Sequence, residues 1–213
     1  LLAAVGLSIL WLSDRVRQGV KQFVSLHFRR PMYDYRRVWS AFTERTAAQL
    51  DRVELCRAVA RLISETFEVL SVTVWLLDAA RGKLQLAAST SLTSDHAVEP
   101  SDATALLQTM TALKAETVQP VLLDQSDEAW CRLLREANPT FFPAGGKRVC
   151  VPLNAGGEAI GFLVLGDRVA GTPFTPEDLD LLKCLGEQLG AALRTLNLSE
   201  QIAQAREMQA FQA

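Results

Sequence analysis

The sequence has few residues that bind metals, and they are scattered. It holds four cysteines and two histidines in 213 residues. No two cysteines form a CxxC pair and neither histidine lies near a cysteine, so we expect no zinc site. We expect reduced thiols, mostly buried as small apolar side chains. These residues are Cys56, Cys131, Cys150, Cys184, His27 and His96.

The sequence also lacks a loop that could hold nucleotide phosphates. It has no GxGxxG motif and no P-loop, and Gly156-Gly157 falls in the turn of a predicted hairpin. Neither His27 nor His96 is followed by the Glu or Asp of a phosphoacceptor motif. We therefore predict that these residues contain no ATP site and no enzyme of their own. We expect no nucleic-acid partner.

No apolar run in the sequence is long enough to cross a membrane by itself. Residues 1–12 are apolar and uncharged, whereas a spanning helix needs roughly 20 residues. Residues 1–50 carry eight Lys and Arg against three Asp and Glu. We interpret residues 1–12 as the end of a truncated transmembrane helix and residues 13–52 as basic juxtamembrane and linker helices. The alternative is a buried or amphipathic helix of a soluble protein.

The basic residues after this apolar run predict an orientation. Positive charges next to a span are retained on the cytoplasmic side of a membrane. The segment would then lie on the cytoplasmic side of the cell inner membrane.

The apolar periodicity changes from helical to extended and back along the chain. Asp34 could cap a single long helix that runs to residue 67, with apolar residues at three- and four-residue steps. Alternating apolar residues then predict two hairpins, of which the second turns at Gly156-Gly157. The predicted strands cover residues 71–77, 84–89, 118–123, 148–153 and 159–165, and the helices between them cover residues 102–114 and 127–136.

A final helix is predicted from Thr175 to the end of the sequence. Its apolar stripe is displaced at Leu198 and Ile202, which is typical of a two-stranded parallel coiled coil. A fraying, solvated tail is the alternative for the residues after Asn197. We interpret residues 199–213 as the start of a helix that leads to a dimerisation or phosphoacceptor region. We predict that linker or dimer packing involves Trp39, Phe42, Leu189, Leu196 and Ile202.

Two motifs near the C-terminal end resemble those of GAF domains. The first is VPL at residues 151–153 followed by GEAIGFLVL at residues 157–165, and the second places Phe174, Glu177 and Asp178 before a Leu-Leu pair. The resemblance covers residues 53–198. It implies an α+β fold with a central antiparallel sheet, helices on both faces and long N- and C-terminal linker helices. One face of the sheet would hold a small-molecule pocket.

The segment before this region, YDYRRVW at residues 33–39, resembles sensor histidine kinases associated with exosortase (PEP-CTERM) systems. This resemblance implies a sensory domain that relays a ligand or membrane signal through its flanking helices. It also implies a homodimer, a kinase core further along the same chain and a response regulator as partner.

Neither of two well-known GAF ligands fits the sequence. The cyclic-nucleotide subset has an Asn-Lys pair and an Asp-Glu pair, but here Leu179 follows Asp178 and residues 166–168 read Gly-Asp-Arg. The pigment-binding subset attaches a bilin to a cysteine, and none lies near His96. Cyclic nucleotides and bilins are therefore disfavoured, and no cofactor is required.

Several side chains are candidates for a pocket, each with a structural alternative. Trp75 and Trp130 could stack on a ligand, Arg148 could hold an anion and Cys150 could be redox-sensitive, although aromatic and thiol groups in strands are usually core. The acidic residues Asp124, Asp127 and Glu128 could bind a cation or complement a helix dipole. A thiol-dependent enzyme similar to free methionine sulfoxide reductase and a ligand-free dimerisation module are the alternative functions.

Overall fold

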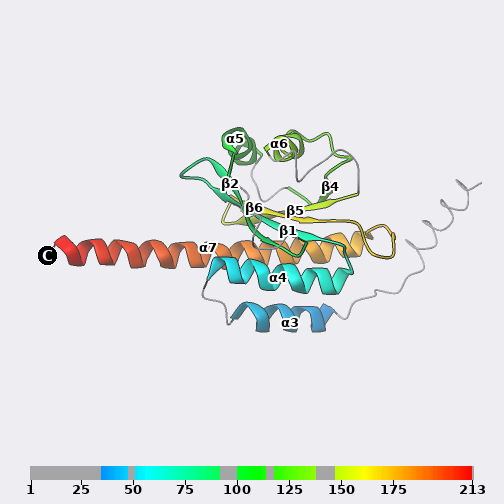
Figure 1. Cartoon of the computed structure of the whole chain (residues 1–213), viewed down its shortest axis with the longest axis horizontal. Helices are drawn as coiled ribbons and strands as arrows, with labels where there is room; N and C mark the ends of the chain where they lie inside the picture. The colour runs from blue at the N-terminus through cyan, green and yellow to red at the C-terminus, as the bar shows by residue number, and fades with distance from the viewer. Residues whose placement is uncertain (1–34, 48–50, 92–99, 114–117, 138–146, 213) are drawn as a thin grey trace, which may run out of the picture.

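The computed structural model describes residues 35–47, 51–91, 100–113, 118–137 and 147–212. Within these ranges the chain forms one six-stranded antiparallel sheet with helices on both faces, which confirms the predicted α+β class (Figure 1). The elements are α3 (Tyr35–Ala47), α4 (Arg52–Phe67), β1 (Val72–Asp78), β2 (Lys83–Ser89), β3 (Ser101–Asp102), α5 (Thr104–Ala112), β4 (Val121–Leu122), α6 (Ala129–Ala137), β5 (Val149–Ala155), β6 (Glu158–Leu165) and α7 (Pro176–Gln212).

Both predicted hairpins are present and form the centre of the sheet. The strand order is β3-β2-β1-β6-β5-β4, so β1 and β6 join the hairpin β1–β2 to the hairpin β5–β6. Gly156 and Gly157 turn the second hairpin with φ of 58° and 80°, a conformation that costs little without a Cβ atom. The short strands β3 and β4 lie at the two edges.

The two faces of the sheet carry different helices. α3, α4 and α7 cover one face, and α5 and α6 cover the other (Figure 1). Side chains alternate along β5, so Val149 and Val151 enter the core under α4 and α7 while Cys150 enters the core under α5 and α6. Each face therefore has its own hydrophobic core.

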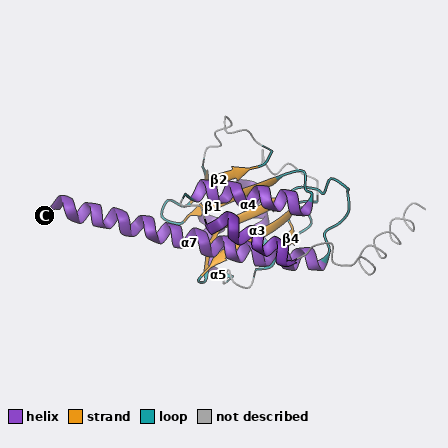
Figure 2. Cartoon of the chain, turned by 90° about the horizontal axis from the view of Figure 1, so that it is seen from below, coloured by secondary structure: helices purple, strands orange, loops and turns teal. Residues whose placement is uncertain are grey.

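The prediction of one continuous helix over residues 34–67 is wrong. The structure has two helices, and α4 begins at Arg52 after the N-cap Asp51, whose side chain accepts a hydrogen bond of 3.1 Å from the N–H of Glu54. α3 lies against both α4 and α7, with Val38 and Phe42 buried (Figure 2). The apolar periodicity continues across the break because both helices pack into the same core, so periodicity alone did not reveal it.

α7 is docked on β5 through two glycines. A Cβ atom on Gly190 would lie 2.6 Å from the carbonyl oxygen of Asn154, and one on Gly186 would lie 2.8 Å from Val151. Glycine inside a helix is unfavourable by itself. In the structure they allow the helix backbone to approach the strand.

The first half of α7 belongs to the domain and the second half leaves it. Leu182, Leu185, Leu189 and Leu193 are buried under the sheet, whereas Leu198 and Ile202 are 50% and 54% exposed. Figure 1 shows the helix continuing well past the other elements. At 1.5 Å per residue its 37 residues span about 55 Å.

The five predicted linker residues fall into two groups. Phe42 and Leu189 are buried in the core of the domain, and Leu196 packs partly against it. Trp39 is 43% exposed and stacks on Phe42 with ring centroids 6.2 Å apart, and Ile202 is exposed. Trp39 and Ile202 are therefore the two of the five that lie on the surface.

We expect Gly190→Ala to destabilise the domain although the same change stabilises most helices. The new methyl group would clash with the backbone of Asn154, and overpacking of this kind costs about 1–3 kcal/mol against a gain of about 1 kcal/mol in helix propensity. Urea unfolding followed by circular dichroism measures the net change. Ser199→Ala, on the exposed part of the same helix, serves as the control. A gain in stability for Gly190→Ala would contradict the close approach.

Candidate functional site

The α5/α6 face of the sheet, where a GAF pocket was predicted, is filled by aromatic side chains. Trp75 from β1 and Trp130 from α6 are fully buried. Trp130 stacks on Phe162 of β6 with centroids 5.6 Å apart and planes 8° apart, and the indole N–H of Trp75 donates to the hydroxyl of Thr73 at 3.2 Å. The structure thus brings the two predicted pocket tryptophans into one core, where they pack against protein side chains.

Cys150 lies in the same core, together with Cys131 of α6. Burial raises the pKa of the Cys150 thiol well above its usual value and that of Cys131 to about 11. Cys56, buried under the opposite face, has its pKa raised to about 12 by burial. Neutral thiols are poor nucleophiles, so these three groups react slowly at neutral pH. Cys184 on α7 is exposed.

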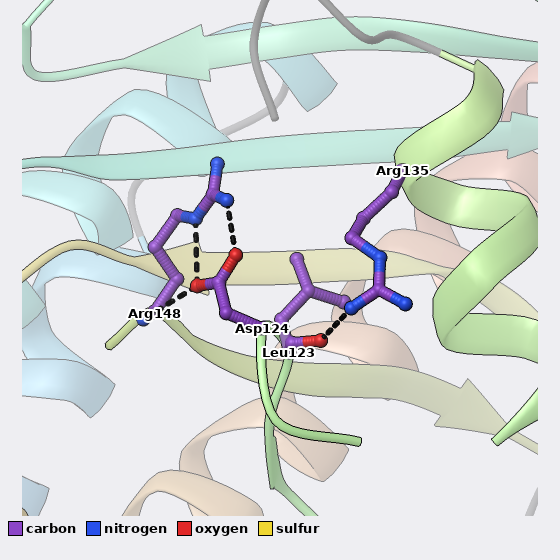
Figure 3. Close-up of polar contacts among 4 residues, drawn as sticks. All are labelled: Leu123, Asp124, Arg135 and Arg148. Atoms are coloured by element: carbon purple, nitrogen blue, oxygen red, sulfur yellow. Dashed lines mark hydrogen bonds and ion pairs between the residues drawn. The ribbon is translucent and has the colours of Figure 1, made fainter. Parts of the chain in front are cut away.

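Arg148 is engaged by Asp124. Its backbone N–H and its Nε donate to Asp124 Oδ2 at 3.1 and 3.0 Å, and its Nη2 donates to Oδ1 (Figure 3). The two side chains are 14% and 7% exposed. An anionic ligand at Arg148 would therefore have to compete with a carboxylate that already occupies the guanidinium fork.

Arg135 adds a second tie at the same edge. It donates from Nη1 to the carbonyl oxygen of Leu123, next to Asp124 (Figure 3). The N–H of Leu123 in turn donates to the carbonyl oxygen of Arg148 at 2.8 Å. Arg148 therefore holds the segment after β4 against β5, and Arg135 holds it against α6.

The acidic cluster predicted before Trp130 is divided by the fold. Asp124 turns to Arg148, whereas Glu128 lies at the start of α6, where its carboxylate accepts from the indole N–H of Trp130. The carbonyl of Glu128 accepts the N–H of Cys131 at 3.1 Å. Among the described residues, no three His, Cys, Asp or Glu side chains are grouped so that they could hold a metal.

A small hollow lies between the start of α5 and the end of α6. Its volume is about 180 Å³, below the roughly 300 Å³ at which ligand pockets begin. Asp102 at its rim has its pKa lowered because the hydroxyl and N–H of Thr104 donate to the carboxylate. The lining residues are Asp102, Ala103, Thr104, Ala105, Leu106, Leu133, Glu136 and Ala137.

The second GAF-like motif builds the start of α7. The N–H of Thr175 donates to Asp178 Oδ2 at 2.7 Å and the hydroxyl of Thr175 accepts from the N–H of Asp178 at 3.2 Å, a reciprocal cap. Asp178 also pairs with Arg168 at 2.9 Å, with both side chains 5% exposed. The guanidinium of Arg168 lies 4.7 Å from the ring centroid of Phe174. The sequence motif contains Phe174 and Asp178, but it does not indicate that Asp178 pairs with Arg168.

The match to known proteins agrees with this geometry. The sequence model of the family described as "GAF domain" matches residues 51–193, which is more than half of the chain. The chain belongs to the GAF domain family. None of the curated proteins matches it.

Solved structures show the same fold at low sequence identity. The GAF domain of an Acinetobacter phosphoenolpyruvate-protein phosphotransferase is similar with a TM-score of 0.57 and 14% identity, over 79% of this chain and 98% of that one. The corresponding domain from Coxiella burnetii gives 0.54 and 17%, over 83% and 97%. A bacteriophytochrome from R. palustris gives 0.59 and 14%, over 87% of this chain and 42% of that one. At these identities the similarity shows a shared fold and does not indicate which ligand this chain binds.

We expect Asp178→Asn to destabilise the domain by about 3–5 kcal/mol, because it leaves the buried charge of Arg168 without its counterion. Chemical unfolding measures the loss. Glu177→Gln changes the same charge on the exposed side of the same turn and should cost less than about 1 kcal/mol. Equal effects of the two substitutions would show that the ion pair is not the cause.

We also expect the four thiols of the native chain to differ sharply in alkylation. Iodoacetamide at pH 8 should label Cys184 within minutes, whereas the other three should stay unlabelled on that timescale because they are buried. Mass spectrometry of tryptic peptides identifies the labelled residues. Rapid labelling of Cys131 or Cys150 in the native chain would show that the core under α5 and α6 is open.

Proposed function

We propose that this chain is the sensory domain of a membrane-bound sensor histidine kinase, which relays a signal through its flanking helices to a kinase core further along the same protein. The observation that carries the proposal is the shape of α7. It begins inside the domain core and continues as an exposed helix beyond it. Any shift of the core that moves α7 is therefore transmitted to whatever follows.

The incoming helices are coupled to the outgoing helix at the point where α7 leaves the domain. Arg52, the first residue of α4, donates from Nη1 to Asn197 Oδ1 at 2.7 Å and pairs through Nη2 with Glu200 at 3.3 Å. Both members of the ion pair are about 40% exposed, so the contact is worth less than about 1 kcal/mol. Such a weak contact can be broken and remade by a modest signal.

The membrane part of the proposal rests on sequence. The apolar residues 1–12 and most of the basic residues after them lie outside the described ranges, and they support an anchor in the cell inner membrane with this domain on the cytoplasmic side. Within the described ranges, no helix is both long and apolar enough to cross a bilayer. The flank YDYRRVW at residues 33–39 supports kinases of the exosortase-associated type.

A homodimer follows from the same reasoning. Beyond Asn197 the apolar side chains of α7 face solvent, and Leu198 and Ile202 lie on one seam at four-residue spacing. Pairing of two copies along this seam would bury the side chains in a parallel coiled coil. A response regulator would receive the phosphoryl group from the kinase core.

A ligand-free relay is the second candidate. The buried pair Trp130 and Phe162 fills the face where a ligand would bind, and Arg148 is occupied by Asp124. One solved structure with this fold carries biliverdin and has a TM-score of 0.55 at 14% identity, but the sequence here disfavours a bilin. The alternative of a thiol-dependent reductase gains little support, because burial raises the pKa of three of the four thiols.

We expect Ile202→Lys to shift residues 35–213 from dimer toward monomer, because a charge would enter the apolar seam. Multi-angle light scattering across a range of protein concentrations measures the change. Ala203→Lys adds the same charge to the neighbouring exposed position off the seam and should leave the dimer intact. If the unsubstituted chain is a monomer at all concentrations, the seam is not a dimer contact.

The kinase assignment has a separate test. The full natural protein that contains this segment should become phosphorylated on a histidine when it is incubated with ATP. Ile202→Lys should change the rate of that reaction and Ala203→Lys should not. The absence of any phosphohistidine would refute the assignment to a histidine kinase while leaving the GAF fold unaffected.

A further inference from the structure

Two contacts attach helix α6 to the rest of the domain. At one end Trp130 stacks on Phe162, which lies opposite Pro152 in the β5–β6 ladder. At the other end Arg135 donates to the carbonyl of Leu123, whose N–H is bonded to the carbonyl of Arg148. Cys150 lies midway between Arg148 and Pro152. Cys131, next to Trp130 on α6, is therefore held on the same side of the sheet as Cys150.

The side chains of these two cysteines enter the same core. Cys150 alternates with Val149 and Val151, which face the opposite side of the sheet, so its thiol faces α6. Cys131 is fully buried on the sheet side of α6, in the same hydrophobic cluster. Burial raises the pKa of Cys150, and a negative charge on Cys131 would raise it further.

The other two cysteines have no such neighbour. Cys56 is equally buried, but it lies on α4 in the core of the opposite face, which contains no second cysteine. Cys184 is on the exposed side of α7. The fold thus makes one pair from four cysteines that are far apart in sequence.

We propose that Cys131 and Cys150 form a redox-sensitive dithiol, which a peroxide converts into a disulfide that links α6 to β5. In the first step the sulfur of Cys131 attacks one oxygen of hydrogen peroxide and becomes a sulfenic acid, and one water is released. In the second step the sulfur of Cys150 displaces hydroxide from that sulfenic acid, and with the thiol proton it leaves as a second water. Two thiols are oxidised by two electrons, and one peroxide is reduced to two waters.

The order of attack follows from the surroundings of the two thiols. A hydrogen bond from Ser126 partly offsets the effect of burial on Cys131, whereas burial of Cys150 is opposed by no such contact. Because both groups are buried, the reaction proceeds when α6 opens from the sheet, over hours rather than minutes. The disulfide is independent of the proposed kinase function, since it requires only the contact between α6 and β5.

The test is peptide mapping of the unmodified chain after it has been treated with hydrogen peroxide under native conditions. Remaining thiols are alkylated in denaturant, and trypsin then places Cys131 in residues 115–132 and Cys150 in residues 149–168. We expect these two peptides joined and two hydrogens lighter than their sum, separable on treatment with a reductant. Cys56 should be recovered as the alkylated thiol, which makes it the matched buried control.

Two cysteine variants distinguish the proposed pair from the exposed thiol. Cys184→Ser removes the exposed thiol and should leave the yield of the joined peptide unchanged, whereas Cys131→Ala should abolish it. Recovery of both Cys131 and Cys150 as alkylated thiols would overturn the proposal. A crosslink of either residue to Cys56 or Cys184 instead would overturn it as well.

Discussion

The contact between the backbones of α7 and β5 sets the position of the other helices on that face. Gly190 lies so close to Asn154 that no side chain fits between them, and a few residues further on Arg194 donates to the carbonyl of Ala155 at 3.3 Å. Because the helix cannot slide or rotate on the strand without a clash, its exit direction from the domain is fixed. α4 then packs beside α7, and α3 lies on both (Figure 2).

The two faces of the sheet have different physical characters. The face under α4 and α7 is packed mainly with aliphatic side chains, together with Phe42 and Phe67, and is covered by the long helices α4 and α7. The face under α5 and α6 holds two tryptophans, a phenylalanine and two thiols under short helices. Mechanical coupling belongs to the first face. The proposed dithiol of Cys131 and Cys150 belongs to the second.

Much of the fold could be predicted because its signals are local. Alternation of apolar residues marks the strands, Gly156 and Gly157 mark a turn that requires positive φ, and Thr175 caps the helix that follows. The break before α4 also has a local signal, an N-cap residue. Asp51 caps α4 by accepting a hydrogen bond from the N–H of Glu54, three residues further on. The helical spacing of apolar residues continues across the break, so it favours a single helix.

What the sequence by itself determined is the order of elements, the caps and turns, and the family motifs, since these depend on residues a few positions apart. Only the tertiary structure decided which side chains meet. Asp124 binds Arg148 across 24 positions and Arg52 reaches Asn197 across 145. Cys131 and Cys150 enter one core from different elements. No local pattern records such pairings, because they arise from how strands and helices stack once the whole sheet has formed.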